Sequence, residues 1–244
     1  MTQYSRYEWN NLYNTDFLPA ARRLPAEAID TTIYHPPTLP DLDDSKWNRR
    51  KALDQIVWNR DCVSQVDRLT KPNGTVWIIG NPETLMMAGN VFVEKGWRVI
   101  NFVRCYRPHI TKPRDLKHWD RKRAFTICWM AKSKHWHWDA EYVHTQFSWS
   151  QKNNWIVYEL RPDEIKFGTH PDQLSDMFVS QMVKSTTPTD GAVLDPFCGT
   201  GTVAVVCERS LLKYVGFETD PEVYRTALAR VSEVKFGMLG GNRR

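Results

Sequence analysis

Residues 191–202, GAVLDPFCGTGT, constrain the fold of this chain more than any other stretch. Three apolar residues lead into Asp195, and a turn with Gly199 and Gly201 then opens a run of small apolar residues. This order predicts a strand, a tight loop and the start of a helix. The glycines let the backbone turn sharply and leave room for a ligand against it. We therefore expect a flat, polar ligand at this loop.

Strand-like and helix-like runs alternate along the rest of the chain. We expect strands at 31–34, 75–79, 97–106, 124–130 and 214–217, and helices at 17–30 (broken by Pro25), 47–69, 82–95, 172–184 and from Pro221. A turn at 71–74, KPNG, should separate the second helix from its following strand. This alternation is typical of an α/β fold, a mostly parallel sheet with helices on both faces. Residues 131–168 lose the rhythm, and we expect an irregular insertion with little regular structure there.

Composition narrows the class of protein. A length of 244 residues fits one α/β domain. No apolar run approaches the roughly 18 residues of a membrane span, and the polar N-terminal stretch does not resemble a signal peptide. Five scattered cysteines without a CxxC pair favour reduced thiols in the cytoplasm. His135 and His137 would share one face of a strand, but no third ligand stands out nearby, so we expect no metal.

Positive charge is concentrated between Arg98 and Arg123. This segment has nine basic residues against two acidic ones, a net charge of +7, whereas the whole chain carries +5. Aromatic and histidine side chains are interleaved with the basic ones, a pattern that indicates contact with nucleic acid. The alternative is a solvated basic face.

The glycine loop by itself leaves its ligand open. Gly199, Gly201 and Ala204 satisfy a dinucleotide fingerprint, and Glu218 follows near the place of a ribose-binding acid. Only 43 residues follow Gly201, however, too few for the rest of a two-half dinucleotide domain. A lone Gly-x-Gly is a weak signal, and a glycine that permits close packing of a helix would explain it equally well.

Several motifs together resemble those of S-adenosylmethionine-dependent DNA amino-methyltransferases, which methylate adenine N6 or cytosine N4. DPFCGTGT (195–202) and GFETDP (216–221) resemble the cofactor-binding half, and His170-Pro171 resembles the family's HP motif. HPPT (35–38), KPNG before TVWIIGN, and YRPH (106–109) stand in the places of the catalytic tetrapeptide, the "LKPGG" turn and the "W-x-K-P-N" segment. The catalytic half comes first, which is the permuted order called the β group.

The resemblance implies one circularly permuted, Rossmann-like methyltransferase domain over residues 1–244. Its catalytic half would be 12–130, its cofactor half 169–235, and the insertion 131–168 a candidate target-recognition region. The implied cofactor contacts are Asp16, His170, Asp195, Phe197, Gly199, Gly201, Thr202 and Glu218. Glu218 would accept hydrogen bonds from the ribose hydroxyls and Asp16 from the adenine amino group, although either could instead be a cap or turn residue. The implied DNA contacts are Arg107, Lys112, Arg114, Lys117, Arg121, Lys122 and Arg123.

The catalytic tetrapeptide departs from the family's pattern of Asp, Asn or Ser, then Pro-Pro, then an aromatic. Here it reads His35-Pro36-Pro37-Thr38. In the family, a side-chain oxygen and a backbone carbonyl hold the amine of a flipped base for in-line attack on the methyl group. The Pro36 carbonyl would still be one acceptor, and a neutral His35 the second. Thr38 removes the aromatic face for base stacking, and Tyr34 should point to the opposite side from His35.

Two functions remain open from the sequence. The predicted function is methyl transfer from S-adenosylmethionine to an exocyclic amino group of double-stranded DNA with the target base flipped, as in site-specific enzymes of restriction-modification systems. The alternative is a degenerate homologue that binds S-adenosylmethionine and nucleic acid or a partner subunit without catalysis. An RNA substrate is a third option, and a homodimer is compatible with the family.

Overall fold

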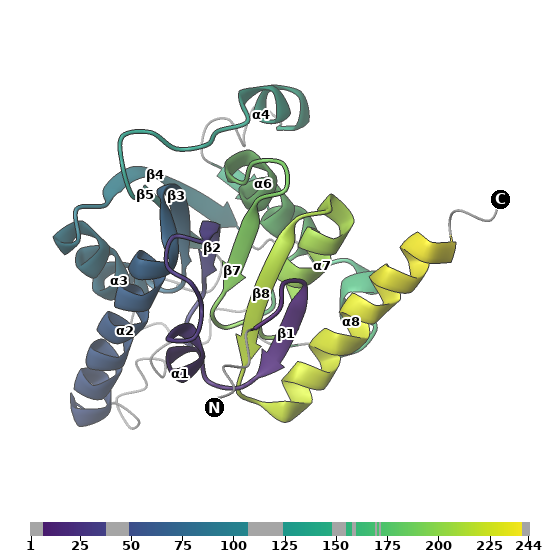
Figure 1. Ribbon diagram of the computed structural model, residues 1–244, viewed down its shortest axis with the longest axis horizontal. Coiled ribbons are helices and arrows are strands. Elements are labelled where there is room, and N and C mark those ends of the chain that lie inside the picture. Colours follow the sequence, from purple (N-terminus) through teal and green to yellow (C-terminus); the bar gives the residue numbers. More distant parts are fainter. Residues whose placement is uncertain are drawn as a thin grey trace, which may run out of the picture.

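The computed structural model describes residues 7–37, 49–106, 124–147, 155–157, 160–168, 170 and 172–240. At its centre lies one eight-stranded sheet with the order β1-β8-β7-β2-β3-β5-β4-β6 (Figure 1). The strands are β1 (Asn11–Asn14), β2 (Ile29–Tyr34), β3 (Thr70–Ile79), β4 (Arg98–Tyr106), β5 (Ala124–Ala131), β6 (Trp155–Val157), β7 (Ala192–Asp195) and β8 (Lys213–Glu218). The helices are α1 (Phe17–Ala21), α2 (Arg49–Leu69), α3 (Pro82–Glu94), α4 (Ala140–Gln146), α6 (Asp176–Thr186), α7 (Thr202–Ser210) and α8 (Pro221–Gly240), with a 3-10 turn η1 (Pro162–Ile165).

Most neighbouring strands run parallel, as the sequence predicted. Only the pairs β3–β5 and β5–β4 are antiparallel among the strand pairs of the described chain. β4 therefore runs in the same direction as β3, because two reversals separate them. The carboxyl ends of β1, β2, β3, β4, β7 and β8 consequently meet at one edge of the sheet, which we call the carboxyl edge.

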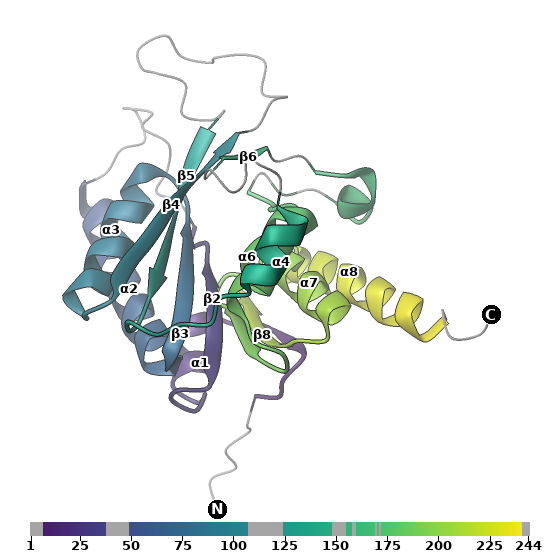
Figure 2. The same ribbon diagram turned by 90° about the horizontal axis from the view of Figure 1, so that it is seen from above.

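Two apolar layers cover the two faces of the sheet, which confirms helices on both faces. One layer packs α6, α7 and α8 on one face, with Phe178 and Val206 fully or almost fully buried. The other packs α1, α2 and α3 on the opposite face around Tyr34 and Phe92. Figure 2 shows the two helix groups on either side of the strands. None of the helices within the described residues is long and apolar enough to cross a membrane.

Two predictions near the N-terminal half are wrong. Residues 71–74 are not a turn but part of β3, where the β2–β3 register shifts from Ile29 opposite Thr70 to Thr31 opposite Thr75. The extra residues bulge, and a Cβ added to Gly74 would lie 2.4 Å from Thr70 Cγ2, so no side chain fits there. The predicted helix 17–30 ends at Ala21, and the last two residues of the predicted range, Ile29 and Asp30, belong to the central strand β2.

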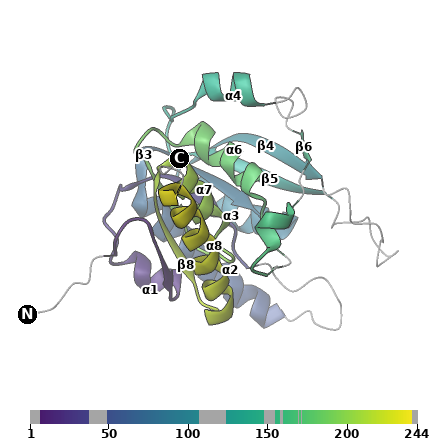
Figure 3. The ribbon, with the colours of Figure 1, turned by 90° about the vertical axis from the view of Figure 1, so that its right-hand side faces the viewer.

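Residues 131–168, for which we expected little regular structure, contain three short elements among their described residues. This segment holds α4, β6 and η1. β6 pairs in parallel with the outer side of β4, where Arg104 lies opposite Trp155 (Figure 3). An open sheet edge exposes unpaired backbone groups, and a short added strand covers it. The following helix, α6, begins at Asp176 rather than at 172, because Ser175 caps it by accepting a hydrogen bond from Phe178 N.

Candidate functional site

A cavity of about 600 Å³ opens at the carboxyl edge of the sheet. Its walls come from the segments that follow β1, β2, β7 and β8, together with residues 170 and 172–174. Ligands of open α/β sheets bind in this position. Seven of the eight predicted cofactor residues line it, namely Asp16, His170, Asp195, Phe197, Gly199, Thr202 and Glu218.

Gly201, the eighth, has a different role. It adopts φ +79 as the N-cap of α7, and a Cβ added there would lie 2.9 Å from Ala227 Cβ on α8. Gly201 thus permits close packing of α8 against the loop. This is the alternative role of a Gly-x-Gly glycine, which allows a helix to approach closely. Gly199 lines the cavity with φ +50, and an added Cβ would meet no atom within 4 Å. The backbone at Gly199 is therefore open to a ligand.

Glu218 joins the end of β8 to the glycine loop. One carboxylate oxygen, Oε2, accepts a hydrogen bond from Gly199 N at 3.0 Å, and Oε1 accepts one from Asp220 N at 2.8 Å. Each carboxylate oxygen has two lone pairs, so these turn contacts leave acceptor capacity for a ligand. Glu218 therefore stabilises the turn through these two hydrogen bonds and also lines the cavity.

Asp16 combines two roles in the same way. It caps α1, accepting a hydrogen bond from Leu18 N at 2.7 Å, and it lines the cavity from the end of β1. The residue is thus a helix cap, as the alternative expected, at the position where the resemblance requires an acid.

Asp195 is buried beneath the loop. Its Oδ1 accepts a hydrogen bond from Phe197 N at 3.3 Å. Burial raises the pKa of this carboxyl to about 8; the Phe197 N–H acts in the opposite direction, and the charge of Glu218 raises the pKa further. The raised pKa favours the neutral form of the Asp195 carboxyl, which holds the loop by accepting the hydrogen bond from Phe197 N.

The Pro-Pro segment lies against the same cavity. His35, Pro36 and Pro37 line it directly after β2, while Thr38 falls outside the described residues. Gln55 Nε2 on α2 donates a hydrogen bond to the Pro37 carbonyl at 2.7 Å, which fixes this backbone. The structure thereby brings the predicted catalytic residues 35–37 and the predicted cofactor residues into one space.

Tyr34 cannot replace the missing aromatic at position 38. Its side chain is fully buried, its hydroxyl donates to Asn59 Oδ1, and its ring packs edge-on against Phe197 at 5.4 Å. It packs in the apolar layer of α1–α3, and His35 lines the cavity. The expectation that the two side chains point to opposite sides stays a prediction.

Trp58 is a residue of the candidate site that the sequence did not indicate. This residue of α2 lines the cavity together with His35 and Pro37, and its ring lies 5.3 Å from Phe197 at an interplanar angle of 44°. In the sequence, a Trp on an amphipathic helix indicates only a core position. No sequence signal marked it as part of the site.

The predicted DNA contacts between Arg107 and Arg123 lie outside the described residues. The strands that flank them are described: β4 ends at Tyr106, which pairs with Ala124 at the start of β5. This end of β4 belongs to the carboxyl edge. The basic segment is therefore attached to the edge of the sheet that holds the cavity.

Comparison with known proteins identifies the family. A model of the N6_N4_Mtase family, described as DNA methylase, matches residues 29–229. The chain belongs to this DNA methylase family. This membership confirms the resemblance drawn from the sequence motifs.

No group of three or more His, Cys, Asp or Glu residues that could hold a metal ion occurs in the part of the chain that the structure describes.

Relatives of this DNA methylase span nearly its whole length. The type II methyltransferase M2.LlaDCHI of Lactococcus lactis subsp. cremoris is 22% identical over 93% of this chain and 91% of its own. M2.DpnII of Streptococcus pneumoniae is 21% identical over 90% and 88%. Among solved structures, the cytosine-N4-specific PvuII DNA methyltransferase superimposes with a TM-score of 0.74 over 95% of this chain and 93% of its own, at 16% identity. The M1.HpyAVI–SAM complex gives 0.69 over 91% and 98%, at 20% identity. The predicted fold class is confirmed.

Proposed function

We propose that this protein transfers a methyl group from S-adenosylmethionine to an exocyclic amino group, adenine N6 or cytosine N4, of double-stranded DNA. One observation carries the proposal: the glycine loop, Glu218 and the His35-Pro36-Pro37 segment face a single cavity of about 600 Å³. Membership of the DNA methylase family supports the same reaction.

The cavity suits S-adenosylmethionine, which supplies an electrophilic methyl group on a sulfonium. The backbone at Gly199 leaves space for the methionine part, since nothing lies within 4 Å of an added Cβ. Glu218 would accept hydrogen bonds from the ribose hydroxyls, and Asp16 from the adenine amino group. Phe17, Phe197 and Phe217 are also among the residues that line the cavity.

The target amine would enter beside the Pro-Pro segment. The Pro36 carbonyl and a neutral His35 would accept its two hydrogens, so that the nitrogen lone pair points at the methyl group. A base reaches this position only when it leaves the duplex stack. The backbone of Pro37, held by Gln55, keeps these acceptors at a fixed place.

Neutral His35 makes the reaction pH-dependent. An imidazolium donates from both nitrogens and cannot accept the amine, so we expect the transfer rate to fall below about pH 6.5. His35→Asp should retain activity and move the acid limb of the profile to lower pH. Steady-state rates at saturating cofactor, with S-adenosylmethionine affinity measured at each pH, check this. A rate that stays flat between about pH 5.5 and 7.5 would argue against this role of His35.

Trp58 offers the aromatic face that Thr38 does not. Base–aromatic stacking contributes about 1–3 kcal/mol, so we expect Trp58→Ala to lower methyl transfer by about tenfold or more. Trp58→Phe should retain most of the rate. The S-adenosylmethionine affinity of Trp58→Ala, measured by calorimetry, separates stacking on the target base from packing on Phe197. If Trp58 stacks on the base, this affinity should stay near the wild-type value. If affinity and rate fall together, Trp58 supports only the loop.

The basic segment would contact the DNA backbone, since it follows β4 at the carboxyl edge of the sheet, the edge at which the cavity opens. The seven arginines and lysines between residues 107 and 123, at positions 107, 112, 114, 117, 121, 122 and 123, would neutralise phosphates. The insertion 131–168 would read the target. A homodimer and a cytoplasmic location stay predictions.

Transfer of radiolabelled methyl groups tests the proposed function. The protein is incubated with methyl-tritiated S-adenosylmethionine and mixed-sequence DNA, double-stranded or heat-denatured, with RNA in parallel. We expect label in double-stranded DNA. Cofactor binding without transfer to any nucleic acid would favour the degenerate homologue, and label in RNA alone would change the substrate class.

A further inference from the structure

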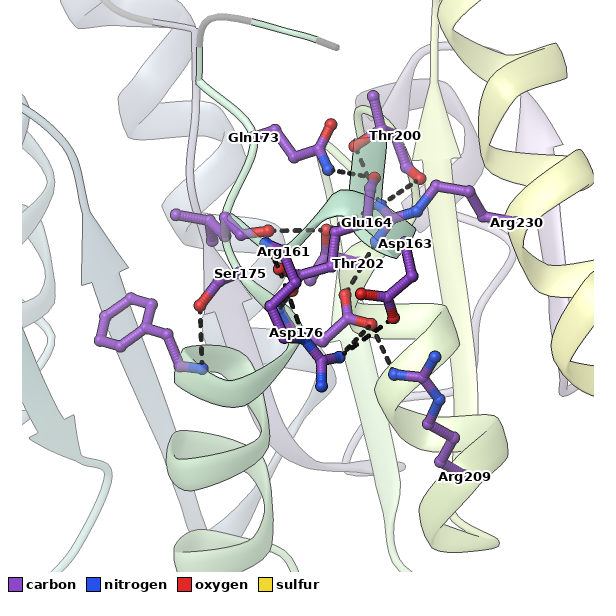
Figure 4. Close-up of polar contacts among 12 residues, drawn as sticks. Arg161, Asp163, Glu164, Gln173, Ser175, Asp176, Thr200, Thr202, Arg209 and Arg230 are labelled. Carbon is purple, nitrogen blue, oxygen red and sulfur yellow. Dashed lines mark hydrogen bonds and ion pairs between the residues drawn. The ribbon is translucent and has the colours of Figure 1, made fainter. Parts of the chain in front are cut away.

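Arg230 is an arginine of α8 that is buried, with 4% of its surface exposed. Its guanidinium contacts three residues from two separate segments (Figure 4). Nη1 donates to the Thr200 carbonyl at 2.9 Å, to Thr200 Oγ1 at 3.1 Å and to Thr202 Oγ1 at 2.9 Å. Nη2 donates to Asp176 Oδ1 at 2.8 Å. One side chain thus connects the glycine loop to the start of α6.

Both segments held by Arg230 are walls of the cavity. Thr200 and Thr202 line it within the loop, and Gln173 and Leu174 line it just before Asp176. The two walls also touch directly, because Thr202 Oγ1 donates to the Leu174 carbonyl at 3.0 Å. Thr202, predicted as a cofactor contact, therefore has its hydroxyl engaged by protein on both sides. The two walls are therefore joined both through Arg230 and by the Thr202–Leu174 hydrogen bond.

The network continues away from the cavity to η1. Asp176 N donates to Glu164, which is 2% exposed and also accepts from Arg161 N at 2.5 Å. Gln173 Nε2 donates to the Glu164 carbonyl at 2.7 Å. Burial raises the pKa of Glu164, the two backbone donors lower it, and the nearby Asp176 charge raises it. Buried charges are costly unless fully paired, and such networks fix a unique geometry more than they add stability.

Helix α8 also packs closely against the glycine loop at a second position. Ala227, which lies three residues before Arg230, packs against Gly201 so closely that an added Cβ would lie 2.9 Å from it. α8 therefore contacts the loop at both Gly201 and Thr200.

We propose that Arg230 is a positioning residue that sets the shape of the cofactor cavity by holding its two walls together. The inference rests on the proposed function only in taking S-adenosylmethionine as the ligand. Removing the guanidinium should release the loop from the Gln173–Leu174 wall. Cofactor affinity should then fall further than the loss of an ion pair to Asp176 alone would cause.

Arg209 supplies a matched control. It binds the same carboxylate through Nη1 at 2.5 Å from Asp176 Oδ2, but it does so from the end of α7 with a side chain 43% exposed. Among the described residues, three arginines pair with Asp176, namely Arg161, Arg209 and Arg230. Of these, Arg230 is the one whose hydrogen bonds reach Thr200 and Thr202. Arg230→Met and Arg209→Met each remove one ion pair, and only the first removes the link to the loop.

The test is calorimetric titration of the full chain with S-adenosylmethionine, beside thermal unfolding without ligand. We expect Arg230→Met to raise the Kd roughly tenfold or more and Arg209→Met to change it by less than about threefold. Arg230→Lys, which keeps a charge for Asp176, should give an intermediate Kd. A structural role alone would lower the unfolding temperature of Arg230→Met without raising its Kd above that of Arg209→Met, and this result would overturn the proposal.

Thr202→Val keeps the test decisive if Arg230→Met does not fold. Valine matches the shape of threonine but removes the Oγ1 that accepts from Arg230 and donates to the Leu174 carbonyl, the two contacts by which Thr202 joins the walls. We expect a raised Kd for both Thr202→Val and Arg230→Lys, and wild-type values for both would refute the positioning role. If the wild-type chain binds no S-adenosylmethionine, the proposed function fails instead, so the two failures are distinguishable.

Discussion

We expect Glu218→Ala to abolish measurable S-adenosylmethionine binding, because the Kd should rise by about a hundredfold or more. Two losses coincide in this variant. The ligand loses a charged acceptor for its ribose hydroxyls, and the backbone N–H groups of Gly199 and Asp220 lose the carboxylate that they donate to. Isothermal titration calorimetry measures the change directly.

Glu222 provides the control for Glu218→Ala. It lies in the first turn of α8, its side chain is 87% exposed, and its ion pair with Arg225 spans 3.8 Å. Surface ion pairs of this kind contribute little, so Glu222→Ala should bind with nearly the wild-type Kd. If Glu218→Ala and Glu222→Ala bind S-adenosylmethionine with equal affinity, Glu218 does not contact the cofactor.

Gly201→Ala should lower the free energy of unfolding by roughly 2–4 kcal/mol and disable cofactor binding. The left-handed backbone at φ +79 disfavours any side chain, and the new methyl group would meet Ala227 Cβ at 2.9 Å and its Cα at 3.1 Å. The loop and α8 must separate to relieve this contact. Urea denaturation followed by circular dichroism measures the loss.

Gly237→Ala is the matched substitution on α8, the helix that packs against Gly201. Gly237 is exposed, and an added Cβ would meet nothing within 4 Å. Alanine in a helix interior is better than glycine by roughly 0.5–1 kcal/mol, so this variant should be slightly more stable than the wild type. A Gly201→Ala protein as stable as Gly237→Ala would show that the loop can move away from α8 freely.

Local sequence patterns predicted the parts of the fold that depend on local geometry. The strand–loop–helix around Asp195 and Gly199 was predicted correctly, because a strand, a glycine turn and a helix start are each specified within a few residues. The KPNG segment misled the prediction, because proline and glycine are typical of a turn and of a bulge alike. Its assignment to β3 depends on pairing with β2. β6 could not be predicted from its sequence either, because these three residues form a strand only by pairing with the open side of β4.

The candidate site divides in the same way. Glu218 and the Pro-Pro segment were predictable because each stands in a motif at the end of a strand. Trp58 was not, because a helical Trp indicates only burial. Arg230 did carry a signal: it shares a helix face with the apolar Ala227, Val231 and Val234. An arginine on such a face needs buried partners, but the sequence could not show that they were Thr200, Thr202 and Asp176.

Identification of the methylated nucleoside tests the central claim most directly. The protein is incubated with S-adenosylmethionine carrying a deuterated methyl group and mixed-sequence double-stranded DNA, which is then digested and analysed by mass spectrometry. The cavity shared by Glu218 and His35-Pro36-Pro37 predicts labelled N6-methyldeoxyadenosine or N4-methyldeoxycytidine. Label found only on cytosine C5, or no labelled nucleoside from a protein that binds the cofactor, would contradict it.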